Sequence, residues 1–179
     1  MGIVRFAICF IALTAFGAIA LMIAHPYLLK MAARSQAEKD YLRLVSEAKT
    51  EIYVSSPELI ERIVIDKRLA ETITKVNLVG PDGKSMDFAS LLGLPNIASV
   101  DIYYCHGAET VIATLNKMTG LKEVKFFLCF PNEMILQEID STSLIQIAIH
   151  SHQPLPNADK QVSKTKERLP NCTIRLTND

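Results

Sequence analysis

The sequence lacks the features that would indicate a nucleic-acid binder or a common class of enzyme. Lysine and arginine together number 19, and aspartate and glutamate also number 19, so the formal net charge is zero. Nucleic-acid-binding proteins concentrate an excess of basic residues that displaces counterions from phosphates. No glycine-rich phosphate loop, nucleophile elbow or zinc-protease signature occurs either. The sequence therefore argues against a nucleic-acid partner, and it predicts a protein without enzymatic activity or cofactor.

Charged residues are also missing from one long stretch near the N-terminus, residues 6–24, which reads FAICFIALTAFGAIALMIA. A helix of about 20 apolar residues is long enough to cross the hydrocarbon core of a bilayer. The run therefore predicts a transmembrane anchor within residues 1–30 and a single-pass membrane localisation, with lipid contacts through 6–24. A cleaved signal peptide is the alternative, but Met22 stands where cleavage after Ala24 would need a small residue. The flanking charges leave the membrane orientation open.

The remaining 150 or so residues have the size of one domain, and they contain an internal repeat. The pattern is apolar-x-x-apolar-x-apolar, and it occurs five times with starts 24, 24, 23 and 25 residues apart. The five instances are Ile73-x-x-Val76-x-Leu78, Ile97-x-x-Val100-x-Ile102, Leu121-x-x-Val124-x-Phe126, Leu144-x-x-Ile147-x-Ile149 and Leu169-x-x-Cys172-x-Ile174. Such a short repeat predicts stacked units that share one core.

Two of the five instances continue into a cysteine at the ninth position, Cys105 and Cys129. With these residues the pattern resembles the consensus of leucine-rich-repeat proteins over residues 73–176. The resemblance implies an α/β fold, a right-handed solenoid of about five coils with parallel strands on the concave wall and helical or irregular returns outside. Five buried strands of an ordinary parallel α/β sheet are the alternative interpretation.

The segment before the repeats, residues 31–72, predicts a cap region. A charged amphipathic helix around Tyr41, a short strand at 51–54 and a helix that begins after Ser56 are expected here. This order resembles the leader of small membrane-anchored bacterial leucine-rich-repeat proteins. The predicted domains are thus 1–30, an anchor or signal peptide, 31–72, the cap, and 73–179, the repeats.

Cys105, Cys129 and His152 occupy equivalent positions in three successive repeats. Neighbouring parallel strands are about 5 Å apart, so a disulfide between the two cysteines is conceivable. Buried structural thiols that pack at the ends of the strands are the preferred interpretation. Three ligands in a straight column do not surround a metal ion tetrahedrally, and no metal site is predicted.

The residues that alternate with the apolar positions are expected to face solvent on the concave wall. One predicted column is Val79, Tyr103, Phe127, His150 and Arg175, and its neighbour is Asn77, Asp101, Lys125, Ala148 and Thr173. From these columns the predicted binding residues are Asp101, Tyr103, Lys125, Phe127 and His150, because exposed aromatic side chains beside charges are typical of interaction sites. Tyr103 and Phe127 are also good strand formers, and they would alternatively cover each other as neighbours.

The predicted function is that of a non-catalytic, membrane-anchored protein-interaction module, which binds a protein or peptide on its concave strand face. Two alternatives stay open. The first is a structural or assembly protein that self-associates at the membrane, and the second is a thiol or metal sensor built on Cys105, Cys129 and His152.

Overall fold

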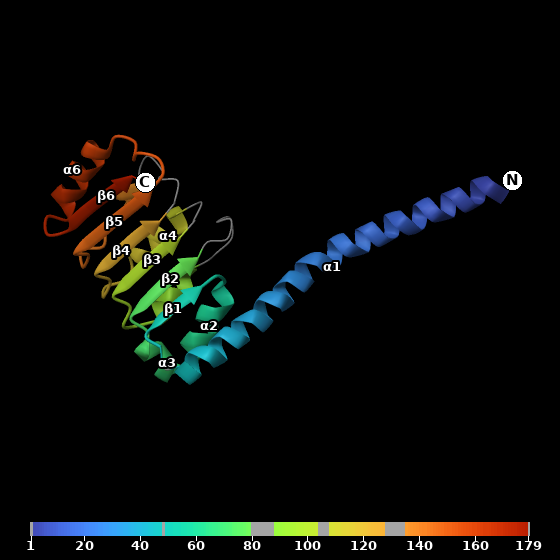
Figure 1. Ribbon diagram of the computed structural model, residues 1–179, viewed down its shortest axis with the longest axis horizontal. Helices are drawn as coiled ribbons and strands as arrows, with labels where there is room; N and C mark the ends of the chain where they lie inside the picture. The colour runs from blue at the N-terminus through green and yellow to red at the C-terminus, as the bar shows by residue number, and fades with distance from the viewer. Residues whose placement is uncertain (1, 48, 80–87, 104–107, 128–134, 179) are drawn as a thin grey trace.

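The computed structural model describes residues 2–47, 49–79, 88–103, 108–127 and 135–178, and over residues 2–23, 57, 88 and 108–110 it describes the backbone without the side chains. Six β-strands form one sheet in which all the neighbouring strands are parallel (Figure 1). The strand order in space is the order along the chain. The strands are β1 (Glu51–Val54), β2 (Lys75–Val79), β3 (Ser99–Tyr103), β4 (Glu123–Phe127), β5 (Gln146–Ser151) and β6 (Thr173–Asn178).

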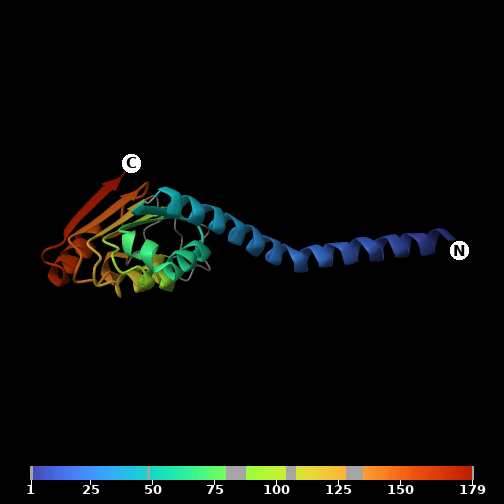
Figure 2. The same ribbon diagram turned by 90° about the horizontal axis from the view of Figure 1, so that it is seen from below.

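The segments between the strands pass through short helices, and these cover one face of the sheet (Figure 2). The helices are α2 (Pro57–Ile65), α3 (Lys67–Thr72), the 3-10 helix η1 (Phe88–Gly93), α4 (Ala108–Leu115), α5 (Ile135–Glu138) and α6 (Ala158–Arg168). Among the residues that the structure describes, no helical layer covers the opposite face of the sheet, and we call it the open face (Figure 2).

The period-2 alternation of strand side chains explains which face the helices cover. Each strand directs at least two residues toward the helical layer, and in β1 to β5 two of these are apolar and at most 2% exposed. These pairs are Ile52 and Val54, Val76 and Leu78, Val100 and Ile102, Val124 and Phe126, and Ile147 and Ile149. The apolar faces of the helices complete the core with residues such as Ile60, Ile63, Ile112 and Leu136.

The joints between successive helices also contain buried polar side chains. Gln161 of α6 is 0% exposed. Its side-chain oxygen accepts a hydrogen bond from the Leu136 amide at 3.3 Å, and its Nε2 donates to the Pro156 carbonyl at 2.7 Å. Thr165, one turn later, donates to the Leu136 carbonyl at 3.1 Å. These bonds attach α6 to α5 and satisfy backbone groups that the short helices leave unpaired.

The N-terminal region forms one long helix, α1 (Gly2–Glu47), whose last turns lie beside β1 and α2 (Figure 1). Ala37 and Leu44 bury their side chains against this part of the core, at 5% exposure each. The other end of α1 extends away from the sheet (Figures 1 and 2). The predicted helix around Tyr41 and the strand at 51–54 are thus present.

The predicted transmembrane anchor and single-pass membrane localisation are corrected by the structure. Among the residues that the structure describes, no helix has the length and apolar character needed to cross a membrane. The part of α1 with described side chains is 24–47, and from Lys30 onward it carries a charged residue in every turn. The apolar run 6–24 lies, apart from Ala24, outside the residues whose side chains are described.

The predicted right-handed leucine-rich-repeat solenoid of about five coils, with a transmembrane helix and a separate cap, is likewise corrected. The fold is α/β with a single six-stranded, all-parallel sheet. The separate cap is wrong because Glu51–Val54 pairs in register with residues 75–78 and therefore belongs to the same sheet as the later strands. The parallel α/β sheet is the part that both interpretations predicted, and it has six strands where the alternative expected five.

The register of the last strand also differs from the prediction. Ile174 pairs with Ile147, and Leu176 pairs with Ile149, so these two residues occupy the inward positions of β6. Cys172 lies before the strand, although its side chain is buried at 4% exposure. Arg175 consequently lies in the same column as Asp101 and not in the column of Tyr103.

Candidate binding surface on the open face of the sheet

The open face is built from three rows of side chains that cross the strands. The first row consists of the first residue of each strand, from Glu51 in β1 to Thr173 in β6. The second row runs from Tyr53 to Arg175, and the third contains Tyr103, Phe127 and His150. The in-register parallel pairing places equivalent residues of neighbouring strands side by side, at the interstrand spacing of about 4.8 Å.

Tyr103, Phe127 and His150 form a continuous stack, which we call the aromatic stack. The ring centroids of Tyr103 and Phe127 are 4.6 Å apart, and those of Phe127 and His150 are 4.7 Å apart. The planes differ by 5° in both pairs, so the rings are parallel. The Nδ1 atom of His150 is 2.6 Å from the Oγ1 atom of Thr177 in the next strand. All three rings are partly exposed. Tyr103 and Phe127 also cover each other, as the alternative interpretation of these two strand residues expected.

A second group, the charged cluster, consists of Glu51, Lys75, Asn77 and Asp101 on the first three strands. The Nζ atom of Lys75 lies 3.0 Å from Oε1 of Glu51 and 3.1 Å from Oδ2 of Asp101. Asn77 Nδ2 donates to the same Glu51 oxygen at 2.7 Å and to the Ile52 carbonyl at 3.2 Å. The lysine thus bridges two carboxylates across three strands.

The proton affinities of the cluster reflect these contacts. The hydrogen bond from the Asn77 amide, assisted by the Lys75 ammonium, lowers the pKa of Glu51 below its ordinary value. Burial alone would lower the pKa of Lys75, but the hydrogen bonds to Glu51 and Asp101 outweigh it and raise that pKa. Burial and the nearby Asp101 carboxylate raise the pKa of Tyr103. At neutral pH the cluster therefore holds the Lys75 ammonium in contact with the ionised Glu51 carboxylate.

The side chains of Asn77 and Asp101 are buried although they lie on the open face. Their residues are 0% and 3% exposed. Asn77 Oδ1 and Asp101 Oδ1 have no hydrogen-bond partner within the described part of the chain. A buried acceptor without a donor is costly. The cluster thus contains two neighbouring oxygen atoms that can still accept hydrogen bonds.

The predicted binding residues are brought together by the sheet, but they are not equally accessible. Tyr103, Phe127 and His150 form the aromatic stack, whereas Asp101 is buried beneath the open face. Lys125 lies beside Asp101 in the second row and makes an ion pair of 3.2 Å with Glu123 of its own strand. The five residues therefore form one patch, with Asp101 as its floor.

Sequence reasoning missed Glu51, Tyr53 and Lys75, which lie on this face. Tyr53 is 62% exposed and begins the second row. The sequence does contain a signal that residues 51–54 form another strand of the same sheet. Ile52 and Val54 repeat the apolar-x-apolar spacing of Val76 and Leu78, 24 residues earlier. The assignment of β1 to a cap concealed it.

A pocket of about 210 Å³ adjoins Tyr53 at the α1 end of the open face. Its apolar floor includes the buried Leu44 and Leu59. Its lining is completed by Asp40, Arg43, Lys49, Glu51 and Tyr53. This end pocket combines an apolar base with charges of both signs.

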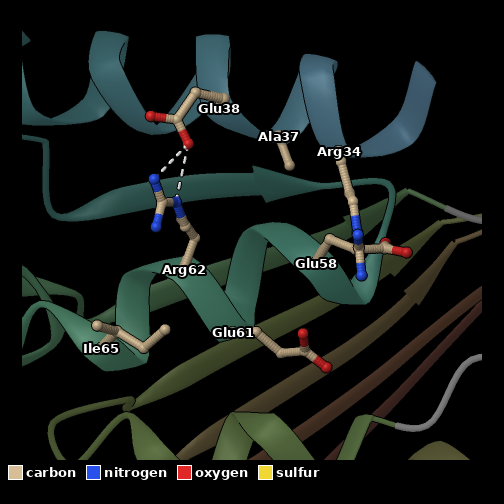
Figure 3. Close-up of a pocket in the computed structure, with 7 residues that line it drawn as sticks. All are labelled: Arg34, Ala37, Glu38, Glu58, Glu61, Arg62 and Ile65. Carbon is tan, nitrogen blue, oxygen red and sulfur yellow. Dashed lines mark hydrogen bonds and ion pairs between the residues drawn. The ribbon is translucent and has the colours of Figure 1, made fainter. Parts of the chain in front are cut away.

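A second pocket, of about 280 Å³, lies between α1 and α2 (Figure 3). The Arg62 guanidinium crosses this groove and contacts Oε2 of Glu38 through Nε at 2.8 Å and through its terminal nitrogen at 2.7 Å. Arg62 also lies 5.6 Å from the centre of the Tyr41 ring. The Tyr41 hydroxyl donates to Asp66 at 3.1 Å, and this bond raises the pKa of Tyr41. These contacts join the two helices, so we interpret this pocket as part of their packing.

The positions of Cys105 and Cys129 lie outside the described residues. His152 is described and exposed. Within the described ranges, no group of three His, Cys, Asp or Glu side chains is arranged to hold a metal ion. The buried thiol that is described belongs to Cys172, whose pKa is raised by burial.

No protein-family model matches the chain, and comparisons with curated proteins and with solved structures find no significant match. The resemblance to leucine-rich-repeat proteins therefore stays a prediction based on the motif, and the functional argument depends on the geometry of the open face.

Proposed function

We propose that this protein is a non-catalytic interaction module, and that it binds a protein or peptide partner on the open face of its sheet. The observation that carries the proposal is the aromatic stack of Tyr103, Phe127 and His150, three rings in register on a face without a helical layer. Partly exposed aromatic side chains that are held rigidly are common anchors of protein interfaces.

The geometry of the stack favours particular contacts. Because the rings stack face to face, each ring covers part of its neighbour, and the stack presents ring edges to a molecule on the open face. Aromatic ring edges carry partial positive charge, so they attract carbonyl oxygens and the faces of other aromatic rings. A peptide backbone or an aromatic side chain provides such groups, and the rigid stack binds it with little loss of rotamer freedom.

The charged cluster adds specificity next to the stack. Asn77 Oδ1 and Asp101 Oδ1 retain acceptor capacity, and Lys75 covers them with an ammonium that is itself bound by Glu51. Because both oxygens are buried, a partner that donates hydrogen bonds to them would first have to displace the Lys75 side chain, which covers Asp101. Charges of both signs on one face also fix the orientation of a partner more than they increase its affinity.

Site-specific crosslinking tests the proposal. A photo-reactive phenylalanine analogue is placed at Tyr53, which is 62% exposed on the open face, or at Leu92, which is 44% exposed in the helical layer. We expect capture of the same partner in repeated experiments from position 53 and no capture from position 92. The partner is then purified, and its affinity for the unmodified protein is measured by calorimetry.

The variant Phe127→Ser identifies the face directly, and Leu92→Ser is its matched control. We expect Phe127→Ser to weaken binding of the purified partner at least tenfold at a temperature where the variant is folded. The conservative change Phe127→Tyr should restore binding, because it keeps the stacked ring. Equal affinities of the Phe127→Ser variant and the unmodified protein would place the site elsewhere and refute the proposal.

A further inference from the structure

The last strand of the sheet, β6, has a neighbour on one side only. It pairs with β5 over residues 173–178, and no other described strand pairs with its outer edge (Figure 1). In a parallel ladder, alternate residues direct their amide and carbonyl groups to the outer side. The edge of β6 is thus a row of backbone donors and acceptors open to another strand.

The core is also incomplete at this edge. Ile174 and Leu176 are the inward residues of β6, and both are partly exposed. The equivalent residues of the other five strands are at most 2% exposed. One more strand beside β6, with apolar residues at the two matching positions, would bury Ile174 and Leu176. Arg175, which lies between them, points to the open face and is exposed.

The opposite edge of the sheet does not supply this strand from a second copy. Ile52 and Val54, the inward residues of β1, are already 0% and 1% exposed. The last turns of α1 lie beside β1 in both views (Figures 1 and 2). A head-to-tail continuation of the sheet from β6 to β1 of another molecule would have to displace this helix.

Two-fold antiparallel pairing of β6 with β6 of a second copy is also unfavourable. An axis at Arg175 covers Ile174 with Leu176, but it places the two Arg175 side chains directly opposite, which destabilises a ladder. An axis at Ile174 sets Leu176 against Cys172, which precedes the strand. An axis at Leu176 sets Ile174 against the polar Asn178. Each of these three registers therefore leaves an apolar residue uncovered or places like charges opposite each other.

We propose that the β6 edge binds an extended peptide segment of another protein by strand addition, and that this segment alternates apolar and acidic residues. Its apolar side chains would cover Ile174 and Leu176, and a carboxylate between them would face Arg175. Arg175 favours an acidic segment, because its side chain is exposed on the open face between Ile174 and Leu176 and can pair with a carboxylate of the added strand. This site is centred on the backbone edge of β6, whereas the one proposed on the open face is centred on the aromatic stack.

Fluorescent octapeptides provide the test on the full chain. One probe alternates valine and glutamate, a second replaces each glutamate by lysine, and a third has the composition of the first with its valines contiguous. We expect the first probe to bind best in fluorescence anisotropy and to slow amide hydrogen exchange in residues 173–178. Arg175→Glu should weaken the glutamate probe at least tenfold and make the lysine probe the better ligand.

Lys122→Glu is the matched control, since it makes the same charge change at an exposed residue before β4, away from the edge. It should leave the order of the three probes unchanged. Absence of binding at millimolar peptide, equal affinity for all three probes, or an unchanged preference in Arg175→Glu would overturn the proposal. A dimer in sedimentation analysis that protects residues 173–178 without peptide would assign the edge to a second copy instead.

Discussion

The ammonium of Lys75 on β2 lies 3.1 Å from the carboxylate of Asp101 on β3, and this ion pair covers a carboxylate side chain that is only 4% exposed. Removal of the lysine would leave a buried charge without its counterion. We expect Lys75→Met to lower the free energy of unfolding by about 2–4 kcal/mol, somewhat below the range for fully buried pairs because the lysine side chain is 30% exposed. Urea unfolding monitored by circular dichroism measures this change.

Two further variants separate the buried charge from a general loss of contacts. The double change Lys75→Met with Asp101→Leu removes both charges and should recover most of the lost stability. Lys125→Met breaks the ion pair with Glu123, in which both side chains are more than a quarter exposed, and should cost only about 1 kcal/mol or less. A double variant that is less stable than Lys75→Met would contradict this explanation.

The depressed pKa of Glu51 makes stability depend on pH in the acid range. Its folded-state pKa lies below the ordinary value of 4.5, so the stabilisation from its ionised form is complete above that value. It is lost as the pH falls from 4.5 through the folded-state pKa, because protonation removes the contacts with Asn77 and Lys75. Glu51→Gln should make the unfolding free energy less steep between neutral pH and pH 3 in urea titrations. Identical slopes for the variant and the unmodified protein would assign the acid sensitivity to other carboxyl groups.

Phe127 occupies the middle of the aromatic stack and contacts a ring on each side. Replacing it by serine removes both contacts, so we expect a loss of about 1–3 kcal/mol from two aromatic pairs. Phe127→Tyr keeps the ring and should change stability by less than about 1 kcal/mol. Thermal unfolding followed by circular dichroism compares the three proteins. Equal destabilisation by both changes would show that the stacking is not responsible.

Gly93 ends η1 where this helix meets α2. A Cβ atom at this position would lie 2.6 Å from Cγ1 and 2.8 Å from Cγ2 of Val64. The branched valine has few rotamers with which to move aside, so Gly93→Ala should destabilise the fold by about 1–3 kcal/mol through overpacking. Adding Val64→Ala creates space for the new methyl group. The double variant should therefore be more stable than the sum of the two single destabilisations predicts. Strict additivity in chemical unfolding would argue against this contact.

Much of the sheet could be predicted from the sequence, because inward strand residues must be apolar and the repeat spaces them evenly. Four of the five predicted patterns coincide with β2 to β5, where Val76 aligns with Val100, Val124 and Ile147. The fifth pattern does not coincide with β6. It placed Cys172 and Ile174 at the inward positions, which Ile174 and Leu176, two residues later, occupy. Leu169 and Cys172 are both buried, but in the turn before β6. Hydrophobic spacing records burial and does not distinguish a turn from a strand.

The buried state of the charged cluster could not be predicted in this way. Asn77 and Asp101 occupy alternating polar positions, which normally face solvent. Their burial depends on contacts with Glu51 of β1 and Lys75 of β2, which join three neighbouring strands. Such cover is a tertiary property, and no local pattern in the sequence records it. The aromatic stack was easier to anticipate, because Tyr103, Phe127 and His150 hold equivalent places in three repeats.

The order of the strands has a consequence for synthesis on the ribosome. Each strand pairs with the one completed 23 to 27 residues earlier, as in the pairs of Val76 with Ile52, Ile147 with Val124 and Ile174 with Ile147. No strand has to wait for a distant later segment, so the sheet can grow from its N-terminal edge while translation continues. A nascent chain therefore exposes one unfinished edge at a time, and that edge is covered by the next segment to emerge.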